Sequence, residues 1–299
     1  MDPNLARYIR RNLSRIGWGV LFFFLAAQVI GGCVQFIPGV AGNIYLSNLA
    51  SYAVIYGFAP LVLWLVLRPL PKGACPGLSL SPRAFARSAV FSVGILYLFN
   101  LVTSLLILAV ESLTGAATGD LLQAALESMP KWFYLLLVGL LAPVFEELIF
   151  RRLLLDRLRP YGDRCAIWFS ALAFGLFHMN LYQFFYATAA GLIFAGIVLK
   201  TGKIWHTILL HAIVNLSSAA LTFLSGTGEW AVALSGVLIL ICIGLAIYCF
   251  VRYFRSFRHF PPQLPATGGE VLRCLLRAPG VWVCALLSLA VSAAVIFLV

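Results

Sequence analysis

Two adjacent glutamates, Glu146 and Glu147, lie inside a hydrophobic run that is long enough to cross a membrane. Two later hydrophobic runs each contain a histidine, His178 and His211, and Asn215 follows the second histidine by four residues. An ionisable side chain at bilayer depth is costly and normally persists only in a polar cavity or beside a partner. Carboxylates and imidazoles are general acids and bases, and an amide donates hydrogen bonds. The pattern therefore indicates acid–base chemistry within the membrane.

The spacing of these residues along a helix assigns them different surroundings. Adjacent helical residues point about 100° apart, so Glu146 and Glu147 are not expected to face the same cavity. Glu147 and Arg151 are four residues apart, which permits an ion pair on one helix face. We therefore assign Glu146 to the chemistry and the pair Glu147–Arg151 to its support. Pro143 cannot donate a hydrogen bond to the carbonyl of Gly139, so we expect a loosened or kinked helix beside the carboxylates.

The same side chains are predicted to lie at similar depth. If the turn after the glutamate run centres on Gly162, Glu146 and His178 each lie sixteen residues from it. That separation is roughly 24 Å along each helix. His211 and Asn215 lie roughly 14 to 20 Å beyond the next cytoplasmic turn, on one helix face. We expect all four to meet in the membrane; the alternative interpretation is a structural ion-pair network that locks two helices.

Composition places the whole chain in the membrane. Of its 299 residues, 62% are hydrophobic and 10% are charged, whereas a soluble domain has about 25% charged residues. A membrane span needs about 20 mostly apolar residues, and nine runs of the chain come close to that length. All nine must be helical because a backbone in lipid has to satisfy its own hydrogen bonds. We therefore predict an all-α polytopic membrane protein, a single membrane-embedded domain over residues 1–299. The runs lie near 17–37, 47–67, 88–110, 132–152, 165–181, 183–199, 204–224, 230–251 and 281–298.

The net charge of +11 is interpreted as a topology signal. With a cytoplasmic N-terminus, 20 of the 21 lysines and arginines lie on the cytoplasmic side and only Lys131 lies outside. This distribution follows the positive-inside rule and predicts an outside C-terminus. We therefore expect the positive charge to contact the lipid bilayer, including anionic lipid, and we expect no nucleic-acid partner. The seven cysteines form no CxxC pair, so neither a disulfide framework nor a thiolate metal site is expected.

The segments outside the runs are short. Loops 69–86 and 252–280 are rich in proline and glycine and are interpreted as tethers. The polar outer segment 111–131 is predicted to hold a short surface helix. Because loop 252–280 separates the last run from the others, we expect a core of about eight spans with 281–298 as one appended C-terminal span.

Three motifs resemble those of a known family of intramembrane endopeptidases. They are Glu146-Glu147-x-x-x-Arg151, Phe174-x-x-x-His178 and His211-x-x-x-Asn215. Their order, separations and placement on three spans are similar to those of the CAAX prenyl protease type II and bacteriocin-processing family, often called CPBP or Abi proteins. The resemblance covers about residues 88–224. It implies a helical core of about eight spans with a site that opens toward the cytoplasmic leaflet.

The resemblance also implies roles for individual residues. Glu146 and His178 would activate a water for attack on a peptide carbonyl, and His211 and Asn215 would stabilise the oxyanion. Glu147 and Arg151 would support the site. The family is also described as metalloproteases, and Glu146, His178 and His211 would form a Zn²⁺ set of the His₂Glu kind. We favour hydrolysis without a cofactor, because there is no HExxH motif and the groups come from three helices, and Zn²⁺ stays as the alternative.

We therefore expect a plasma-membrane endopeptidase that cleaves a membrane-associated protein or peptide precursor. The first alternative is a scaffold, immunity or regulatory protein with the same fold, although such a protein has no reason to keep costly buried polar groups. The second is a transporter, since buried glutamate and histidine residues also form proton relays. Transporters usually show inverted repeats and paired broken helices, and the sequence shows neither.

Overall fold

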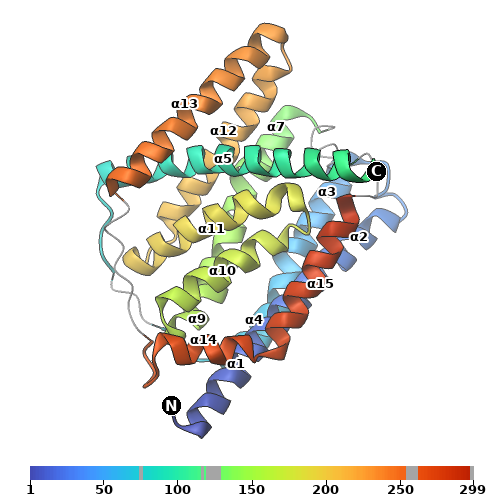
Figure 1. Cartoon of the computed structure of the whole chain (residues 1–299). Helices are drawn as coiled ribbons and strands as arrows, with labels where there is room; N and C mark the ends of the chain where they lie inside the picture. The colour runs from blue at the N-terminus through green and yellow to red at the C-terminus, as the bar shows by residue number, and fades with distance from the viewer. Residues whose placement is uncertain (74–76, 116–117, 119–128, 254–261, 297–299) are drawn as a thin grey trace. The chain divides into compact units, whose positions relative to one another are not determined.

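The computed structural model describes residues 1–73, 77–115, 118, 129–253 and 262–296 (Figure 1). All regular secondary structure in these residues is helical. The α-helices are α1 (Pro3–Leu25), α2 (Gly31–Cys33), α3 (Ile44–Tyr52), α4 (Ala59–Leu67), α5 (Pro82–Thr114), α7 (Lys131–Tyr134), α8 (Ala142–Glu147), α9 (Asp156–Leu158), α10 (Asp163–Phe177), α11 (Leu181–Thr201), α12 (Trp205–Ser225), α13 (Glu229–Tyr253), α14 (Gly268–Leu276) and α15 (Pro279–Ile296). The π-helical segments are η1 (Ala26–Ile30), η3 (Ala53–Phe58), η4 (Leu135–Leu141) and η5 (Leu148–Leu155), and the 3₁₀ segments are η2 (Val34–Phe36) and η6 (Arg159–Tyr161).

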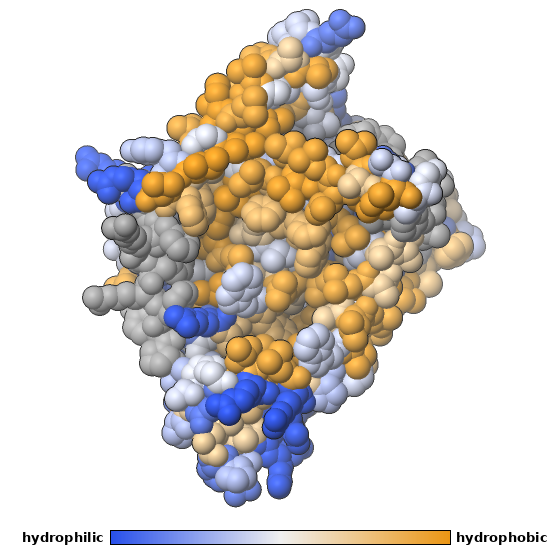
Figure 2. All heavy atoms as spheres, in the orientation of Figure 1, coloured by the Kyte–Doolittle hydropathy of each residue, from blue (hydrophilic) through white to orange (hydrophobic). Residues whose placement is uncertain are grey.

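The predicted class, an all-α multi-pass membrane protein, is confirmed. Among the described residues, seven helical stretches are long and apolar enough to cross a membrane, or eight if one bent pair counts as a span. Leu105 of α5 and Leu240 of α13 are more than half exposed. Figure 2 shows apolar side chains over much of the visible surface. Such exposure is expected of helices whose solvent is lipid, because the hydrocarbon core accepts apolar side chains that water does not.

The number of spans differs from the nine that the sequence predicts. The run at 165–181 forms α10, which has only 15 residues and a length of about 23 Å. It ends early because Met179 adopts the left-handed conformation, with φ of 48°. The run at 281–298 counts as a possible membrane span only when it is taken together with α14, and the two helices are bent by 63° relative to each other. Hydropathy reports where a chain is apolar and not where a helix stops, so the sequence extended α10 too far.

The contacts divide the chain into two compact units, and the single-domain organisation stays a prediction. Unit 1 comprises Met1–Ala74, Leu148–Phe169 and Phe260–Ala290, and unit 2 comprises Cys75–Glu147, Ser170–His259 and Val291–Val299. In unit 2, helix α5 packs against α11, α12 and α13 (Figure 1). The core there is apolar and includes Leu96, Tyr97, Phe194, Leu210 and Val214. This packing fixes α12, which carries two of the predicted site residues.

Unit 1 pairs the first helix of the chain with segments close to its other end. Helix α1 packs against α4 and α14. Gly17 faces the backbone of Gly280 so closely that a side chain at either position would clash, and the Gly280 N–H donates to Ser14 Oγ at 3.0 Å. The loop predicted as a tether, 252–280, therefore contains a docked helix, α14. The surface helix predicted within 111–131 lies mostly outside the described residues.

Candidate active site

The two glutamates are the last residues of α8, a six-residue α-helix between two π-helical segments, η4 and η5. A π-helix closes i→i+5 hydrogen bonds and is frequent at functional sites. Glu146 is 5% exposed and Glu147 is fully buried. The sequence predicted a loosened helix beside the carboxylates, and the structure shows π-helical segments on both sides of them.

The imidazole of His211 lies between the two carboxylates. Its Nε2 is 3.6 Å from Glu146 Oε2, and its Nδ1 is 3.4 Å from Glu147 Oε1. The two glutamates lie at different edges of this ring, and the expectation that they face separate cavities stays a prediction. One imidazole reaches both because its nitrogens project from different edges of the ring. Arg151 is fully buried, and its pairing with Glu147 stays a prediction.

His178 lies at the end of α10, on the turn that joins it to α11. Its Nδ1 lies 3.0 Å from the backbone carbonyl of Phe174. A carbonyl only accepts hydrogen bonds, so Nδ1 carries the proton and Nε2 of the neutral ring keeps its lone pair. The ring of Phe174 contacts the rings of both His178 and His211, and His211 Nε2 lies 3.6 Å from Glu146 Oε2. The two predicted histidines and Glu146 therefore lie in one cluster.

The turn after His178 is held by local hydrogen bonds and close helix packing. Asn180 caps α11, since its side chain accepts from the Tyr182 N–H at 2.8 Å. Gly175 of α10 sits so close to Thr188 of α11 that a side chain there would clash. Small residues permit such close helix approach in membranes. The left-handed Met179 therefore belongs to a tightly built hairpin that fixes the position of His178.

Two phenylalanines hold the histidine rings. Phe174 makes edge-on contacts with His178 and His211, with ring centroids 5.3 and 5.6 Å apart, and Phe194 lies 5.5 Å from His211. Phe174 and Phe194 are essentially fully buried. The motif contained Phe174, but the sequence assigned it no role and did not mark Phe194. The i,i+4 spacing of Phe174 and His178 could have indicated that Phe174 contacts the histidine. Nothing in the sequence marked Phe194, because it is one apolar residue among many in an apolar helix.

Asn215 is half-buried and its side-chain Nδ2 donates to the backbone carbonyl of Val138 at 2.8 Å. In the π segment, the Ala142 N–H bonds to the carbonyl of Leu137, five residues back. The next donor in this pattern would be residue 143, which is proline and has no N–H. Asn215 therefore supplies the hydrogen bond that Pro143 cannot. One of its two amide hydrogens is used in this way, and the second can serve another acceptor.

The residues that would form a zinc set do not meet the geometry of one. No group of three or more His, Cys, Asp or Glu side chains in the described part of the chain could hold a metal ion. Glu146 and Glu147 flank His211. The Nδ1 proton of His178 is directed to a backbone carbonyl, which leaves Nε2 of that ring open and is compatible with either mechanism. The prediction that catalysis uses no cofactor stays a prediction, and elemental analysis decides it.

Comparison with known families supports the motif assignment. Residues 128–217 match the family model described as type II CAAX prenyl endopeptidase Rce1-like, which is less than half of the chain. The match confirms the resemblance drawn from the three motifs and contains every predicted site residue: Glu146, Glu147, Arg151, His178, His211 and Asn215. No curated protein and no solved structure matches the chain.

Proposed function

We propose that this protein is an intramembrane endopeptidase that hydrolyses a peptide bond of a membrane-associated protein or peptide precursor. The observation that carries the proposal is the position of His211 between Glu146 and Glu147, with His178 and His211 both in contact with the ring of Phe174. Acid–base side chains that converge in a buried place are typical of active sites. The Rce1-like match over the same residues supports the reaction class.

Glu146 and His178 act as the bases in the proposed reaction. They remove a proton from a water whose oxygen attacks the scissile carbonyl carbon, and the unprotonated Nε2 of His178 suits this role. The separation of 3.6 Å between Glu146 and His211 is longer than a hydrogen bond, as is common before substrate is bound. Collapse of the intermediate breaks the C–N bond, and the abstracted proton passes to the leaving amine nitrogen.

His211 and Asn215 stabilise the negative charge that develops on the carbonyl oxygen. An imidazole N–H and the second amide hydrogen of Asn215 are suitable donors, and such donors act strongly in a water-poor site. Asn215 is already held in place by its bond to Val138, so it needs little reorganisation. Glu147 orients His211 from the other edge of the ring, and it also supports the helix together with Arg151.

The substrate class follows from the surroundings of the site. Glu146 and His211 are each 5% exposed in helices that are apolar enough to cross a membrane. A substrate therefore has to reach the site from the membrane or its surface. We place the protein in a prokaryotic plasma membrane, with its site open to the cytoplasmic leaflet.

The test is cleavage of a candidate membrane peptide in proteoliposomes by the wild-type protein and Glu146→Ala. Loss of a general base is expected to lower the rate about 10²–10⁴-fold. Glu229→Ala removes an exposed carboxylate at the start of α13, outside the three motifs, and is expected to leave the rate unchanged. If Glu146→Ala keeps full biological activity in the host, the protein is a scaffold or transporter and the enzymatic proposal fails.

A further inference from the structure

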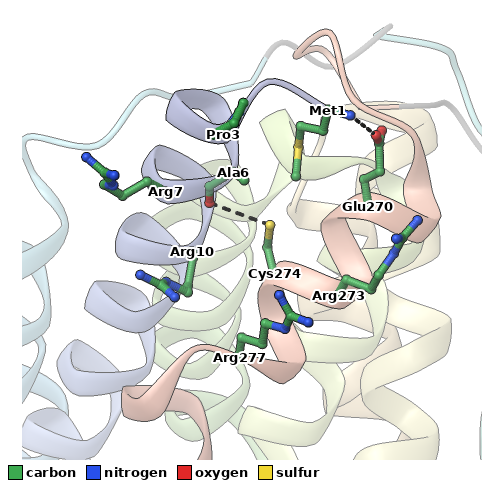
Figure 3. Close-up of a pocket in the computed structure, with 9 residues that line it drawn as sticks. All are labelled: Met1, Pro3, Ala6, Arg7, Arg10, Glu270, Arg273, Cys274 and Arg277. Atoms are coloured by element: carbon green, nitrogen blue, oxygen red, sulfur yellow. Dashed lines mark hydrogen bonds and ion pairs between the residues drawn. The ribbon is translucent and has the colours of Figure 1, made fainter.

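A pocket with a volume of about 360 Å³ lies in unit 1, between the start of α1 and helix α14. Figure 3 shows side chains from both helices around it, and in Figure 2 hydrophilic residues gather at this end of α1. None of its residues belongs to the motifs of the proposed active site. The lining residues are Met1, Pro3, Ala6, Arg7, Arg10, Glu270, Arg273, Cys274 and Arg277.

The pocket carries a strong excess of positive charge. Four arginines line it: Arg7 and Arg10 of α1, Arg273 of α14, and Arg277, which directly follows α14. Its one carboxylate, Glu270, is already engaged: the Met1 amine lies 2.7 Å from Glu270 Oε1, and the N–H and Oγ1 of Thr267 both donate to Oε2. Within the described part of the chain, none of the four guanidinium groups makes an ion pair or a hydrogen bond. They are therefore available to an anion.

Packing below the pocket holds the two helices together. Val271 and Cys274 of α14 are buried, and the Cys274 thiol donates to the carbonyl of Ala6 at 3.6 Å. Arg10 of the first helix, and Arg273 and Arg277 from the segment near the other end of the chain, line the same pocket beside this contact. Residues from the two ends of the chain thus form one cationic site.

Helix α14 also presents the features of a helix at a membrane surface. Leu272 and Leu276 lie one turn apart and are each 53% exposed. Trp282, which is 46% exposed, donates its indole N–H to the carbonyl of Leu276 at 2.8 Å. Amphipathic helices with leucine on one face and arginine on the other lie at the level of the lipid headgroups, where tryptophan is also enriched. A helix of this kind at the membrane surface would hold the arginine pocket close to the lipid phosphates.

We propose that this pocket binds the phosphate group of an anionic phospholipid in the leaflet that the positive-inside rule assigns to the cytoplasm. Arginine binds phosphate oxygens through two parallel N–H donors, which makes it suited to this ligand. Basic pockets on the cytoplasmic side of membrane helices bind anionic headgroups in this way. The headgroup occupies the pocket, and its acyl chains lie along Leu272 and Leu276.

The test uses the purified full chain in neutral detergent, titrated with short-chain phosphatidylglycerol and followed by native mass spectrometry. Phosphatidylcholine of the same chain length and inorganic phosphate are the two comparison ligands. The Arg10→Gln/Arg277→Gln variant removes one guanidinium from each of the two segments, and Arg11→Gln/Arg83→Gln is the matched control. Arg11 and Arg83 are exposed and lie outside the pocket lining, so the net charge changes equally.

Phosphatidylglycerol is expected to bind more tightly than phosphatidylcholine and inorganic phosphate. Each arginine near the surface contributes about 5-fold in affinity, so the pocket variant is expected to bind about 25-fold more weakly. The control variant is expected to change affinity less than about 3-fold, because distant exposed charges are screened by salt. Arg10→Lys/Arg277→Lys keeps the charge and should fall between wild type and the glutamine variant, whose folding is checked by thermal unfolding.

Three results would overturn the proposal. Equal weakening by the control variant would mean that diffuse surface charge, and not the pocket, attracts the lipid. Equal affinity for inorganic phosphate and phosphatidylglycerol would make the ligand a free phosphate. Equal affinity for phosphatidylglycerol and phosphatidylcholine would show that the pocket does not select anionic headgroups. None of these measurements depends on the proteolytic activity.

Discussion

Asn215 Nδ2 lies 2.8 Å from the backbone oxygen of Val138 and donates the hydrogen bond that Pro143 cannot supply to it. A helix-breaking residue in a membrane helix is tolerated when another helix satisfies the backbone group that it leaves open. Here the residue that does so is also the proposed oxyanion donor. Asn215 therefore couples the shape of the helix that carries the glutamates to the chemistry of the site.

This coupling predicts that Asn215→Ala destabilises the protein less when Pro143 is also replaced. Alone, Asn215→Ala leaves the partly buried Val138 carbonyl without its donor and is expected to cost about 1 kcal/mol of stability. In the Pro143→Ala background, residue 143 gains an N–H and the carbonyl can be satisfied within the helix. Thermal unfolding of the wild type, the two single variants and the double variant in detergent measures the difference. An equal loss of stability in both backgrounds would contradict the compensation.

Activity should respond differently, because the second amide hydrogen of Asn215 serves the oxyanion in the proposed mechanism. Asn215→Ala is expected to lower kcat roughly 10²–10³-fold while substrate binding survives. Replacing Pro143 does not restore an oxyanion donor, so the double variant should stay slow even where its stability has recovered. Recovery of both properties together would mean that Asn215 acts only through the helix.

Glu146 and His178 are predicted to act as one unit. Each single replacement by alanine should lower the rate of cleavage about 10²–10⁴-fold, since each removes part of the activation of one water. The double variant should be little slower than either single variant, because groups that act together are strongly non-additive. Single-turnover rates in liposomes provide the measurement. Losses that multiply would show that the two residues act in separate steps.

Glu147→Gln is expected to affect folding before it affects chemistry. The change removes a negative charge next to His211. It also removes the partner that the i,i+4 spacing predicts for Arg151, and a buried arginine without its counter-charge is strongly destabilising. We expect a lower yield of folded protein in detergent, measured by size-exclusion chromatography. Glu111→Gln, at the far end of α5, is the control. A well-folded Glu147→Gln protein with no activity would instead place Glu147 in the chemistry.

Metal content tests the cofactor prediction directly. We expect purified, active protein to contain no stoichiometric zinc by elemental analysis and to keep its activity after chelation. A catalytic zinc would appear as one equivalent per chain, with activity lost on chelation and restored by Zn²⁺. One equivalent that disappears in both His178→Ala and His211→Ala would replace the glutamate mechanism.

The predicted sidedness can be mapped with single cysteines in a background without the native ones. Ser79→Cys and Gly268→Cys are expected to be labelled from the cytoplasm, and Thr227→Cys from outside. The short α10 leaves this expectation unchanged, because both ends of the α10–α11 hairpin are assigned to the cytoplasmic side. Labelling of Ser79→Cys from outside would reverse the orientation of the whole chain.

The sequence by itself determined the class of the protein and singled out the candidate residues of its site. A composition with 62% hydrophobic residues indicates a membrane protein. Its membrane-spanning segments are helical because a backbone in lipid must satisfy its own hydrogen bonds. Ionisable residues in such a chain are costly, so Glu146, His178 and His211 stood out without any structure. Their order and spacing were enough to indicate the family, which the match over residues 128–217 then confirmed.

Only the tertiary structure decided how these residues meet. Adjacent residues of an α-helix point about 100° apart, and from this angle alone Glu146 and Glu147 face different directions. The angle could not show that the imidazole of His211 in α12 lies close to both carboxylates. Nor could it show that Asn215 replaces a donor missing at Pro143, or that Arg10 and Arg277 share one pocket. Helical periodicity is a local property of the chain. Contacts between distant segments depend on how helices pack, and packing is set by all of their side chains at once.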